Sequence, residues 1–281
     1  NQAASSEVGT ARRAGYAGPS CFCRTARAAY TGSVDAVALR PRAFVRVAGP
    51  DAEDFLQRML SNDVAARATG ESCEALVLTP KARVIAPMSV LRRGDDDFLL
   101  LTEPELGDTL RDQLVRMRFA AKAEIEREEH RSTVVFDDGA DGIPTADYGR
   151  PAVEVLDAEV EATLDADALD AMRIAAGTPR FGREIDDRVL PAEAGLDAYA
   201  VDFHKGCYVG QEVISRIKSV GRVNRRLVSL RPAAVRWDRL AVRLRPRLRH
   251  DHQEPLLFLG HRQRLRQGPA RLRPIRSAAD R

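Results

Sequence analysis

The segment Lys205-Gly206-Cys207-Tyr208-Val209-Gly210-Gln211-Glu212 decides how the rest of this 281-residue chain is interpreted. Two glycines within five residues permit tight backbone turns, and the second stands where an apolar pattern typical of a helix begins. The first backbone N–H groups of a helix have no partner inside it and favour anions and thiolates. Cys207 lies just before that helix and two residues from Lys205. Both features favour a reactive thiolate at Cys207, with a buried structural cysteine as the alternative.

The stretch before this segment, residues 178–205, shows no regular period. Irregular stretches of this length in a compact domain are usually functional or disordered, and its paired opposite charges favour function. The carboxylate of Glu193 is suited to accept two parallel N–H bonds from a flat amino-heterocycle, although local chemistry alone favours a surface or capping role. His204 is suited to shuttle protons, but a lone histidine is more often structural.

Apolar periods along the chain predict an α+β fold with antiparallel sheets, because strands and helices mix without a strict βαβ alternation. Helices are expected from residues 49–51, after a Thr-x-x-Glu capping box at 102–105, from 165 to a glycine cap at 177, and from 210 to 221. Strands are expected within 34–47, in a hairpin around 79–81, at 98–101, 133–136 and 222–230, and at a sheet edge over 123–127.

Composition bounds the classes of protein to consider. Hydrophobic residues make up 44% and charged residues 30% of the chain, as in soluble globular proteins. No apolar run approaches a membrane span or a signal-peptide core, so a cytoplasmic chain is expected. Four cysteines without regular spacing fit a reducing compartment. Cys21 and Cys23 form an incidental pair rather than a metal site, since no other Cys–His pair is near, and no metal site is predicted.

Charge is distributed unevenly along the chain. Residues 231–281 hold fourteen Arg, no Lys and four acids, about +10, which leaves about −7 for residues 1–230 of a chain whose net charge is +3. An Arg-rich tail can hold phosphate. Aromatic stacking residues are nearly absent there, so nucleic-acid binding is not favoured, and a poorly ordered or out-of-frame end is the preferred interpretation. We therefore expect a loose leader over 1–29, a folded domain over 30–230, and a separate tail.

Taken together, these segments resemble the YgfZ family of folate-binding proteins, which is related to the glycine-cleavage T-protein. Residues 205–212 look like the signature Lys-Gly-Cys-Tyr-x-Gly-Gln-Glu of that family, and Arg216, Gly221 and residues 225–227 continue the match. The other matching segments are Val47-x-Gly49-x-Asp51 with Phe55-Leu56-Gln57, Ser61-Asn62-Asp63-Val64, Arg173 to Gly177, and Pro191-x-Glu193. The resemblance covers about residues 30–230.

The resemblance implies a T-protein-like fold with a central cleft for tetrahydrofolate, and a role in assembly or repair of iron–sulfur client proteins. The family has also been linked to tRNA modification. It implies that Glu193 anchors the pterin and that Cys207 and Lys205 carry any chemistry. The other implied folate-binding residues are Arg173, Asn62, Asp63, Tyr208, Gly210, Gln211 and Glu212. Residues 231–281 lack strand alternation, so the family's C-terminal barrel is expected to be degraded or missing. A monomer is expected.

Two branches of the family differ at one segment. T-proteins carry an Asp in a Gly-Gly-x-x-Asp-Asp-like stretch, placed to act at the folate nitrogen that receives the one-carbon unit. Residues 82–87 here read Ala-Arg-Val-Ile-Ala-Pro, so that charge stabilisation is missing. Ala82 also replaces a usual glycine, which predicts a looser hairpin. The alternatives to an iron–sulfur maintenance protein are an aminomethyltransferase of glycine cleavage and an RNA-associated protein; whether the chain is an enzyme stays open.

The reactive-thiol interpretation of Cys207 predicts a pH-dependent alkylation rate whose midpoint lies below the ordinary cysteine pKa of about 8.5. The measurement is the rate of iodoacetamide labelling of Cys207 against pH, with Cys207→Ser as the blank. A midpoint at or above the free-thiol value would contradict this interpretation.

Overall fold

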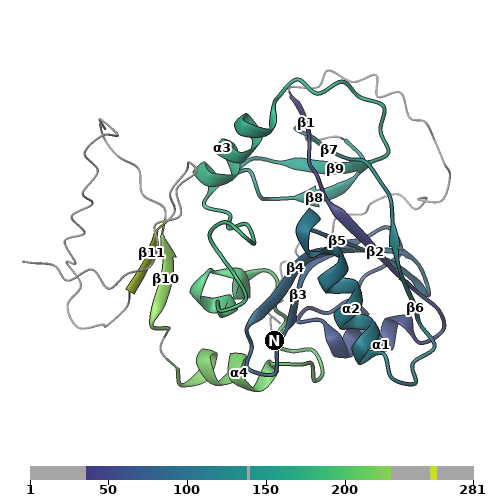
Figure 1. The fold of residues 1–281 in the computed structure, drawn as a ribbon, viewed down its shortest axis with the longest axis vertical. Helices are drawn as coiled ribbons and strands as arrows, with labels where there is room; N and C mark the ends of the chain where they lie inside the picture. The colour runs from purple at the N-terminus through teal and green to yellow at the C-terminus, as the bar shows by residue number, and fades with distance from the viewer. Residues whose placement is uncertain (1–35, 138–139, 222, 229–253, 258–281) are drawn as a thin grey trace, which may run out of the picture.

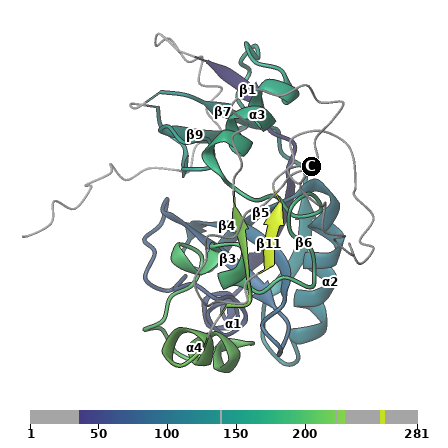
Figure 2. The same ribbon diagram turned by 90° about the vertical axis from the view of Figure 1, so that its left-hand side faces the viewer.

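The computed structural model describes residues 36–137, 140–221, 223–228 and 254–257, and they form two antiparallel sheets that lie one above the other (Figures 1 and 2). The larger sheet has the strand order β3-β4-β5-β2-β6. Its strands are β2 (Ala43–Ala48), β3 (Ser72–Leu78), β4 (Val84–Gly94), β5 (Asp97–Thr102) and β6 (Glu124–Glu128). The expected α+β class with antiparallel sheets is confirmed, as is the edge position of β6.

The smaller sheet has the order β1-β7-β9-β8 and lies on the other side of the domain. Its strands are β1 (Val37–Leu39), β7 (Ser132–Val135), β8 (Ile143–Thr145) and β9 (Ala152–Leu156). A separate pair joins β10 (Arg225–Val228) to β11 (Glu254–Leu257) in parallel. The strand β11 was not expected, because it falls in the Arg-rich segment where no strand alternation was found.

Helices cover the sheets on their outer faces. The helices α1 (Ala52–Met59) and α2 (Gly107–Met117) pack on one face of the larger sheet (Figure 1). The helix α3 (Ala166–Ala176) packs on the smaller sheet. The helix α4 (Gln211–Ser219) begins beside the β3–β4 hairpin. Three short 3-10 helices are η1 (Pro104–Leu106), η2 (Pro191–Glu193) and η3 (Leu196–Ala198). The largely irregular character expected of residues 178–205 is confirmed.

Side-chain alternation explains why both faces of the larger sheet are buried. On β5, Phe98 and Leu100 point into the core under α1 and α2, whereas Leu99 and Leu101 point to the opposite side. There they meet Phe44 of β2 and Ile143 of β8, so an apolar contact joins the two sheets. A strand buried on both faces needs a continuous apolar run, and for this reason its sequence is Phe-Leu-Leu-Leu.

Local capping signals give mixed outcomes. The predicted caps of α3 are confirmed: the Asp165 carboxylate accepts a hydrogen bond from the Ala168 N–H at 2.7 Å, and Gly177 has the left-handed conformation at the helix end. The predicted capping box at residues 102–105 is wrong. The Thr102 hydroxyl instead donates to the carbonyl of Pro87 at 2.7 Å, because Thr102 is still part of β5 and faces β4.

The β3–β4 hairpin forms where it was predicted, but the expected loosening at Ala82 is wrong. The Thr79 N–H donates to the Arg83 carbonyl at 2.9 Å and the Ala82 N–H donates to the Thr79 carbonyl at 2.8 Å, so the turn is closed. Ala82 adopts a φ of 56°, a left-handed conformation that glycine takes more easily, and it is fully buried. The predicted leader over 1–29, with Cys21 and Cys23, and all of 231–281 except 254–257 lie outside the described residues.

His130 forms a polar link between the two sheets. Its Nε2 lies 2.9 Å from a carboxylate oxygen of Glu128 on β6, and its Nδ1 lies 2.7 Å from Asp157, which follows β9. Burial disfavours the charged imidazole, but the hydrogen bonds to Glu128 and Asp157 outweigh it, and the pKa of His130 is raised. Protonated His130 therefore stabilises the folded state at pH values below the ordinary histidine pKa of about 6.5, and this contribution is lost as pH rises through the folded pKa.

We expect His130→Gln to lower the free energy of unfolding by about 0.5–1 kcal/mol more at pH 5.5 than at pH 9, since only the protonated imidazole makes both ion pairs. Urea unfolding at the two pH values measures the difference. His204→Gln is the matched control, because the His204 side chain is 94% exposed. Equal losses for His130→Gln at both pH values would contradict the assignment.

Candidate functional site

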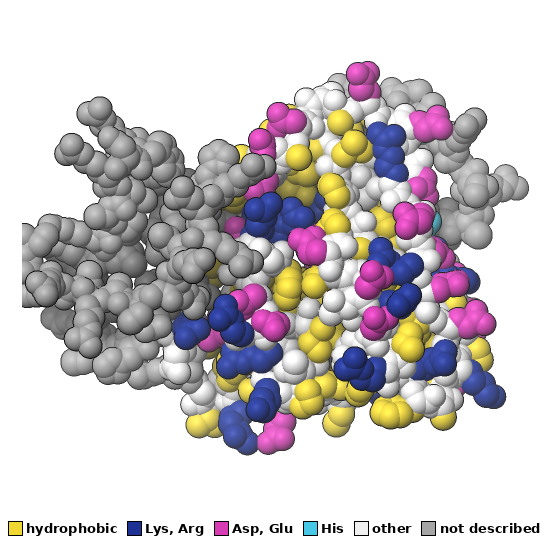
Figure 3. Space-filling view, viewed as in Figure 1, with side chains coloured by type: hydrophobic (Ala, Val, Ile, Leu, Met, Phe, Trp, Pro, Cys, Tyr) yellow, Lys and Arg dark blue, Asp and Glu magenta, His cyan; other side chains and the backbone are white. Residues whose placement is uncertain are grey.

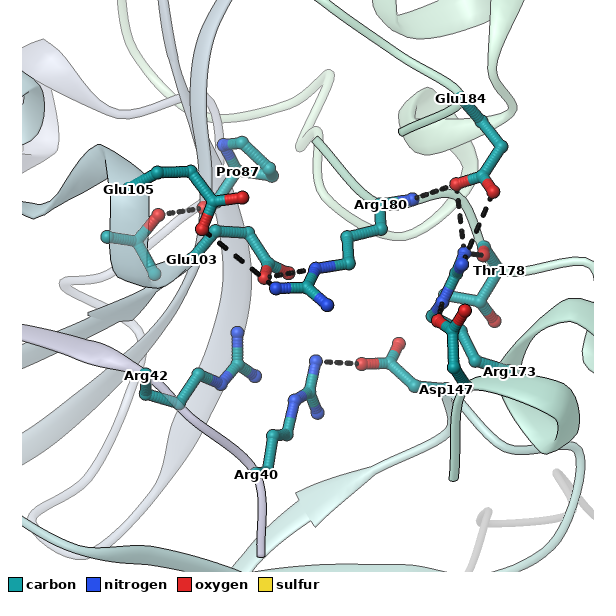
Figure 4. A network of polar contacts seen from close by, with 12 residues as sticks. Arg40, Arg42, Pro87, Glu103, Glu105, Asp147, Arg173, Thr178, Arg180 and Glu184 are labelled. Carbon is teal, nitrogen blue, oxygen red and sulfur yellow. Dashed lines mark hydrogen bonds and ion pairs between the residues drawn. The ribbon is translucent and has the colours of Figure 1, made fainter. Parts of the chain in front are cut away.

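A cavity of about 50 Å³ lies where the two sheets and the loop before α4 meet. Its wall comes from the segment between β1 and β2, from β3 and β4, from the segment before β9, and from residues 178–180 and 196–200. The polar side chains of the lining are Arg40, Arg42, Glu74, Glu103, Asp147, Arg173, Thr178, Arg180 and Tyr199. Figure 4 shows the guanidinium groups of Arg40 and Arg42, from the segment between β1 and β2, directed toward the same centre as that of Arg180, from the loop after α3.

Arg40 and Arg42 are held by carboxylates of the smaller sheet. The Glu154 carboxylate on β9 accepts from Arg40 Nη1 at 2.5 Å and from Arg42 Nη2 at 2.6 Å, and its other oxygen accepts from Ser132 at 2.9 Å. Arg40 Nη2 also donates to Asp147 at 2.7 Å. Glu154 is only 1% exposed. Burial alone would raise the pKa of Glu154, but the two guanidinium groups lower it to about 2, so this carboxylate stays ionised.

Arg173 and Arg180 are ion-paired on the opposite side of the cavity. Arg180 Nε donates to Glu103 at 2.7 Å, and so joins the loop after α3 to the end of β5. Arg173 on α3 donates to Glu184 at 2.9 Å and to the Thr178 carbonyl at 2.6 Å (Figure 4). Arg173 was predicted as a cofactor-binding residue, and it does line the cavity.

Glu74 on β3 is a cavity carboxyl that, unlike Glu103 and Asp147, makes no ion pair with an arginine of the described residues. Its Oε1 accepts a hydrogen bond from the Ser89 hydroxyl of β4 at 2.6 Å, and within the described residues no cationic side chain lies within ion-pair distance of it. Burial raises the pKa of Glu74 to about 7, against the smaller opposing effect of the Ser89 hydrogen bond. Glu74 therefore differs from the ion-paired carboxyls Glu103, Asp147 and Glu154 of this region.

Tyr199 provides the aromatic surface of the cavity. Its side chain is 48% exposed, which is unusual for a tyrosine that lines a cavity in a packed domain. Burial of the hydroxyl raises its pKa above the ordinary value, and the carboxyls of Asp147 and Glu74 raise it further. An aromatic ring with an accessible face, beside carboxyl and guanidinium groups, is suited to hold a flat polar ring.

The Ser61-Asn62 turn after α1 positions two sides of the cavity. The Ser61 hydroxyl donates to the Ala200 carbonyl at 2.6 Å and accepts from the Leu76 N–H at 2.9 Å. The Asn62 side-chain amide donates to the carbonyls of Glu74 at 2.7 Å and Tyr199 at 3.2 Å. This turn therefore fixes strand β3 against the loop that carries Tyr199. Asn62 was predicted to bind the cofactor, but it is not among the lining residues and acts through the backbone that it holds.

Lys205 extends the same arrangement. Its ammonium donates to the carbonyls of Leu60 at 2.8 Å and Asn62 at 2.7 Å and lies 5.4 Å from the ring centre of Tyr208. Burial lowers the pKa of Lys205 to about 8. The ammonium of Lys205 is thus bound to the turn after α1. Activation of the Cys207 thiol by Lys205 stays a prediction. The Cys207 side chain is exposed.

The rest of the predicted octamer serves to seat α4. Tyr208 is buried among apolar residues that include Leu76 and Leu78 of β3, and its hydroxyl has no hydrogen-bond partner within the described part of the chain. Gly210 has a φ of 87° and packs so closely on the hairpin that an added Cβ would lie 2.8 Å from the Thr79 carbonyl oxygen. Gln211 is partly exposed, and Glu212 is an exposed residue that pairs with Arg216 at 2.9 Å. None of these four lines the cavity.

Two further predicted carboxylates lie outside the lining as well. Glu193, on η2, is buried, and its Oε2 accepts from the Leu190 N–H at 2.9 Å and lies 3.7 Å from Arg83 Nη1. Asp63 accepts from the Gln57 side-chain amide at 2.9 Å and from the Ala66 N–H at 3.1 Å. The implied role of Glu193 as pterin anchor stays a prediction. His204, weighed above as a proton shuttle, is 94% exposed and does not line the cavity.

Of the ten predicted site residues, the cavity therefore brings in Arg173 alone. The polar lining residues that were not among the predicted site residues are Arg40, Arg42, Glu74, Glu103, Asp147, Thr178, Arg180 and Tyr199. Arg180 and Thr178 belonged to the charged irregular stretch that was predicted to be functional, which is the one signal that pointed to them. Glu74 and Arg40 carry no local signal, because Glu74 lies on the larger sheet and Arg40 directly after β1 of the smaller one, and they meet only in the folded domain.

Among the described residues, no group of three or more His, Cys, Asp or Glu side chains is arranged to hold a metal ion, and no helix is both long and apolar enough to span a membrane. On the face seen in Figure 3, basic and acidic side chains alternate and no large region of one sign forms.

Comparisons with known proteins agree on the fold. No family model matches the chain. It is 27% identical over 241 residues to an iron–sulfur cluster assembly factor IBA57 homolog, mitochondrial, of Pyricularia oryzae, covering 76% of this chain and 60% of that protein. It is 25% identical over 238 residues to an aminomethyltransferase of Lysinibacillus sphaericus, and the match covers 66% of this chain and 64% of that protein. The crystal structure of the glycine cleavage system aminomethyltransferase T of Bartonella henselae superposes on this chain with a TM-score of 0.57 at 16% identity. The superposition covers 65% of this chain and 63% of that structure. The chain thus spans somewhat under two thirds of each relative.

The role of the Ser61 hydroxyl can be tested by Ser61→Ala. The change leaves the Ala200 carbonyl and the Leu76 N–H unpaired in a buried place, and we expect a loss of about 1–3 kcal/mol in the free energy of unfolding. Urea denaturation measures it. Ser219→Ala, at the exposed end of α4, is the control and should cost under about 0.5 kcal/mol. Similar small effects for both variants would show that the turn does not hold the two walls together.

Proposed function

We propose that this chain, which is similar to an IBA57 homolog and to aminomethyltransferases, binds a reduced folate between its two sheets and serves the assembly or repair of iron–sulfur proteins. The fold supports the first part, since a relative with the same architecture is an aminomethyltransferase. The name of the Pyricularia oryzae relative supports the second part. The observation that carries the proposal is the cavity in which Tyr199, Glu74 and the arginines converge.

The chemistry of the lining fits a reduced folate. A pterin ring is flat and presents adjacent N–H donors, which suit a carboxyl such as Glu74, and a carbonyl oxygen, which suits a guanidinium. The exposed ring of Tyr199 offers a stacking surface. The carboxylates at the far end of a folate suit arginine, which binds carboxylates with two parallel hydrogen bonds. Tetrahydrofolate, when bound, supplies ring nitrogens that carry one-carbon units.

The size of the cavity requires side chains to move on binding. Ligand pockets usually enclose about 300–1,000 Å³, whereas this cavity encloses about 50 Å³. Arg180 is the side chain best placed to give way, because it reaches across the opening to Glu103 and is about a quarter exposed (Figure 4). Release of this ion pair exposes one guanidinium and one carboxylate to the ligand without disturbing the buried Glu154 cluster.

A second candidate function is one-carbon transfer, favoured by the similarity to the aminomethyltransferase of Lysinibacillus sphaericus. Against it, the strand position predicted to carry the T-protein Asp holds Ala86 and Pro87, and Pro87 lines the cavity without a charged group. We therefore place folate binding without aminomethyl transfer first. A role for Cys207 with an iron–sulfur client, the link to tRNA modification, and the expected cytoplasmic location and monomeric state stay predictions. The name of one relative places that protein in mitochondria.

Calorimetric titration with tetrahydrofolate under anaerobic conditions tests the proposal. We expect saturable binding by the wild-type chain, no aminomethyl transfer in a reconstituted glycine-cleavage assay, and binding weakened about 3- to 10-fold in Tyr199→Ala, which loses the stacking surface. Tyr199→Phe keeps the ring and should stay within about 2-fold of wild type.

Phe119→Ala serves as the surface control, since Phe119 is 83% exposed and does not line the cavity. Absence of binding by the wild-type chain would reject the proposed function. Binding that Tyr199→Ala leaves unchanged would move the site away from this cavity, and robust transfer activity would favour the second candidate.

A further inference from the structure

Glu74 differs from the other carboxyl groups of the cavity in its partners. Glu103 is paired with Arg180 and Asp147 with Arg40, each at 2.7 Å. Glu74 accepts one hydrogen bond from the Ser89 hydroxyl, and in the described ranges no Lys, Arg or His side chain lies within 4.0 Å of its oxygens. Glu74 is half-buried, and a carboxylate partly removed from water without a neighbouring cation is costly, which favours the protonated form.

The groups that face Glu74 come from several elements. Ser89 on β4 donates to it, Asp147 before β9 repels its charge, and Arg40 and Arg42 attract it only weakly because they are bound to Glu154. Two neutral neighbours are Tyr199, on the loop after η3, and Cys73, which is on β3 beside Glu74. Burial raises the pKa values of both side chains, and the charge of Glu74 raises them further. Burial outweighs the attraction and raises the pKa of Glu74 to about 7.

We propose that Glu74 exchanges a proton with solvent on ligand binding: it is partly protonated in the free protein at neutral pH and becomes ionised when an amino-heterocycle donates N–H bonds to it. The carboxyl O–H bond breaks, the proton passes to solvent buffer, and the carboxylate accepts the N–H groups of the ligand. This inference rests on the proposed function only for the identity of the ligand as a reduced pterin. The cavity position, the missing cation and the Ser89 contact are properties of the free chain.

Glu193 is the natural comparison, because the sequence resemblance assigned the pterin to it. Its Oε2 already accepts from the Leu190 N–H and lies near Arg83, and it is not part of the cavity lining. Glu193 thus differs from Glu74 in having a guanidinium nearby and in lying outside the cavity lining. Glu74 and Glu193 therefore make a matched pair of Glu→Gln variants, one inside the cavity and one outside it.

The first measurement needs no ligand. Infrared difference spectra between wild type and Glu74→Gln, recorded from pH 5 to pH 9, should show a protonated-carboxyl band that disappears with a midpoint near pH 7. Glu193→Gln should keep this band. Ser89→Ala removes the hydrogen bond that favours the ionised form, so its midpoint should lie at higher pH. A band absent over the whole range, or one that Glu193→Gln removes instead, would overturn the assignment.

The second measurement is calorimetry with tetrahydrofolate at pH 7 in phosphate and in Tris, two buffers with different ionisation enthalpies. About half a proton should be released per ligand bound by wild type, since the pKa of Glu74 is about 7. Glu74→Gln should release none of it and bind about 10- to 100-fold more weakly, because one charged acceptor is lost. Glu193→Gln should keep the release.

The two measurements separate the possible failures. If wild type binds no tetrahydrofolate, the proposed function and the ionisation on folate binding both fail, while the infrared titration still decides whether Glu74 is a neutral carboxyl in the free protein. If wild type binds and Glu74→Gln releases as many protons as wild type, the role of Glu74 is rejected and folate binding stands.

Discussion

The ion cluster of Arg40, Glu154 and Arg42 is the interaction on which the site depends. Glu154 is 1% exposed and accepts from both guanidinium groups, so the strand segment that leads into the larger sheet is tied to the smaller one. Loss of one partner of such a buried cluster typically costs about 3–5 kcal/mol, because uncompensated charge is left behind. The apolar contact of Phe44 with Ile143 also holds the same two sheets together, but it contributes no charged group to the cavity.

The cluster also sets the electrostatics of the cavity. Because Glu154 and Asp147 neutralise Arg40 and Arg42, these arginines stabilise the ionised form of Glu74 only weakly. A carboxyl near its midpoint and an exposed aromatic ring, Tyr199, then remain as the groups most responsive to a ligand. Folate binding, iron–sulfur maintenance and the proton exchange at Glu74 are proposals that share this one arrangement, and the Ser61-Asn62 turn keeps the strand of Glu74 beside the loop of Tyr199.

The sequence predicted the elements whose causes are local. The caps of α3 at Asp165 and Gly177 and the hairpin after Leu78 depend on neighbouring residues, and they form as expected. The capping prediction at Thr102 is wrong because the Thr102 hydroxyl has a partner on the adjacent strand, which no local sequence pattern indicates. The signature segment 205–212 indicated the family, yet its side chains mainly seat α4 and bind the turn after α1. The cavity groups come from separate segments of the chain, so only the tertiary structure identifies Glu74.

A crystal structure of the chain with tetrahydrofolate would locate the ligand. We expect the pterin ring between the two sheets, stacked on Tyr199, with its N–H groups within hydrogen-bond distance of the Glu74 carboxylate and the Arg40–Glu154–Arg42 cluster unchanged. A pterin bound instead at Glu193, with the cavity side chains in the positions described here, would contradict this expectation.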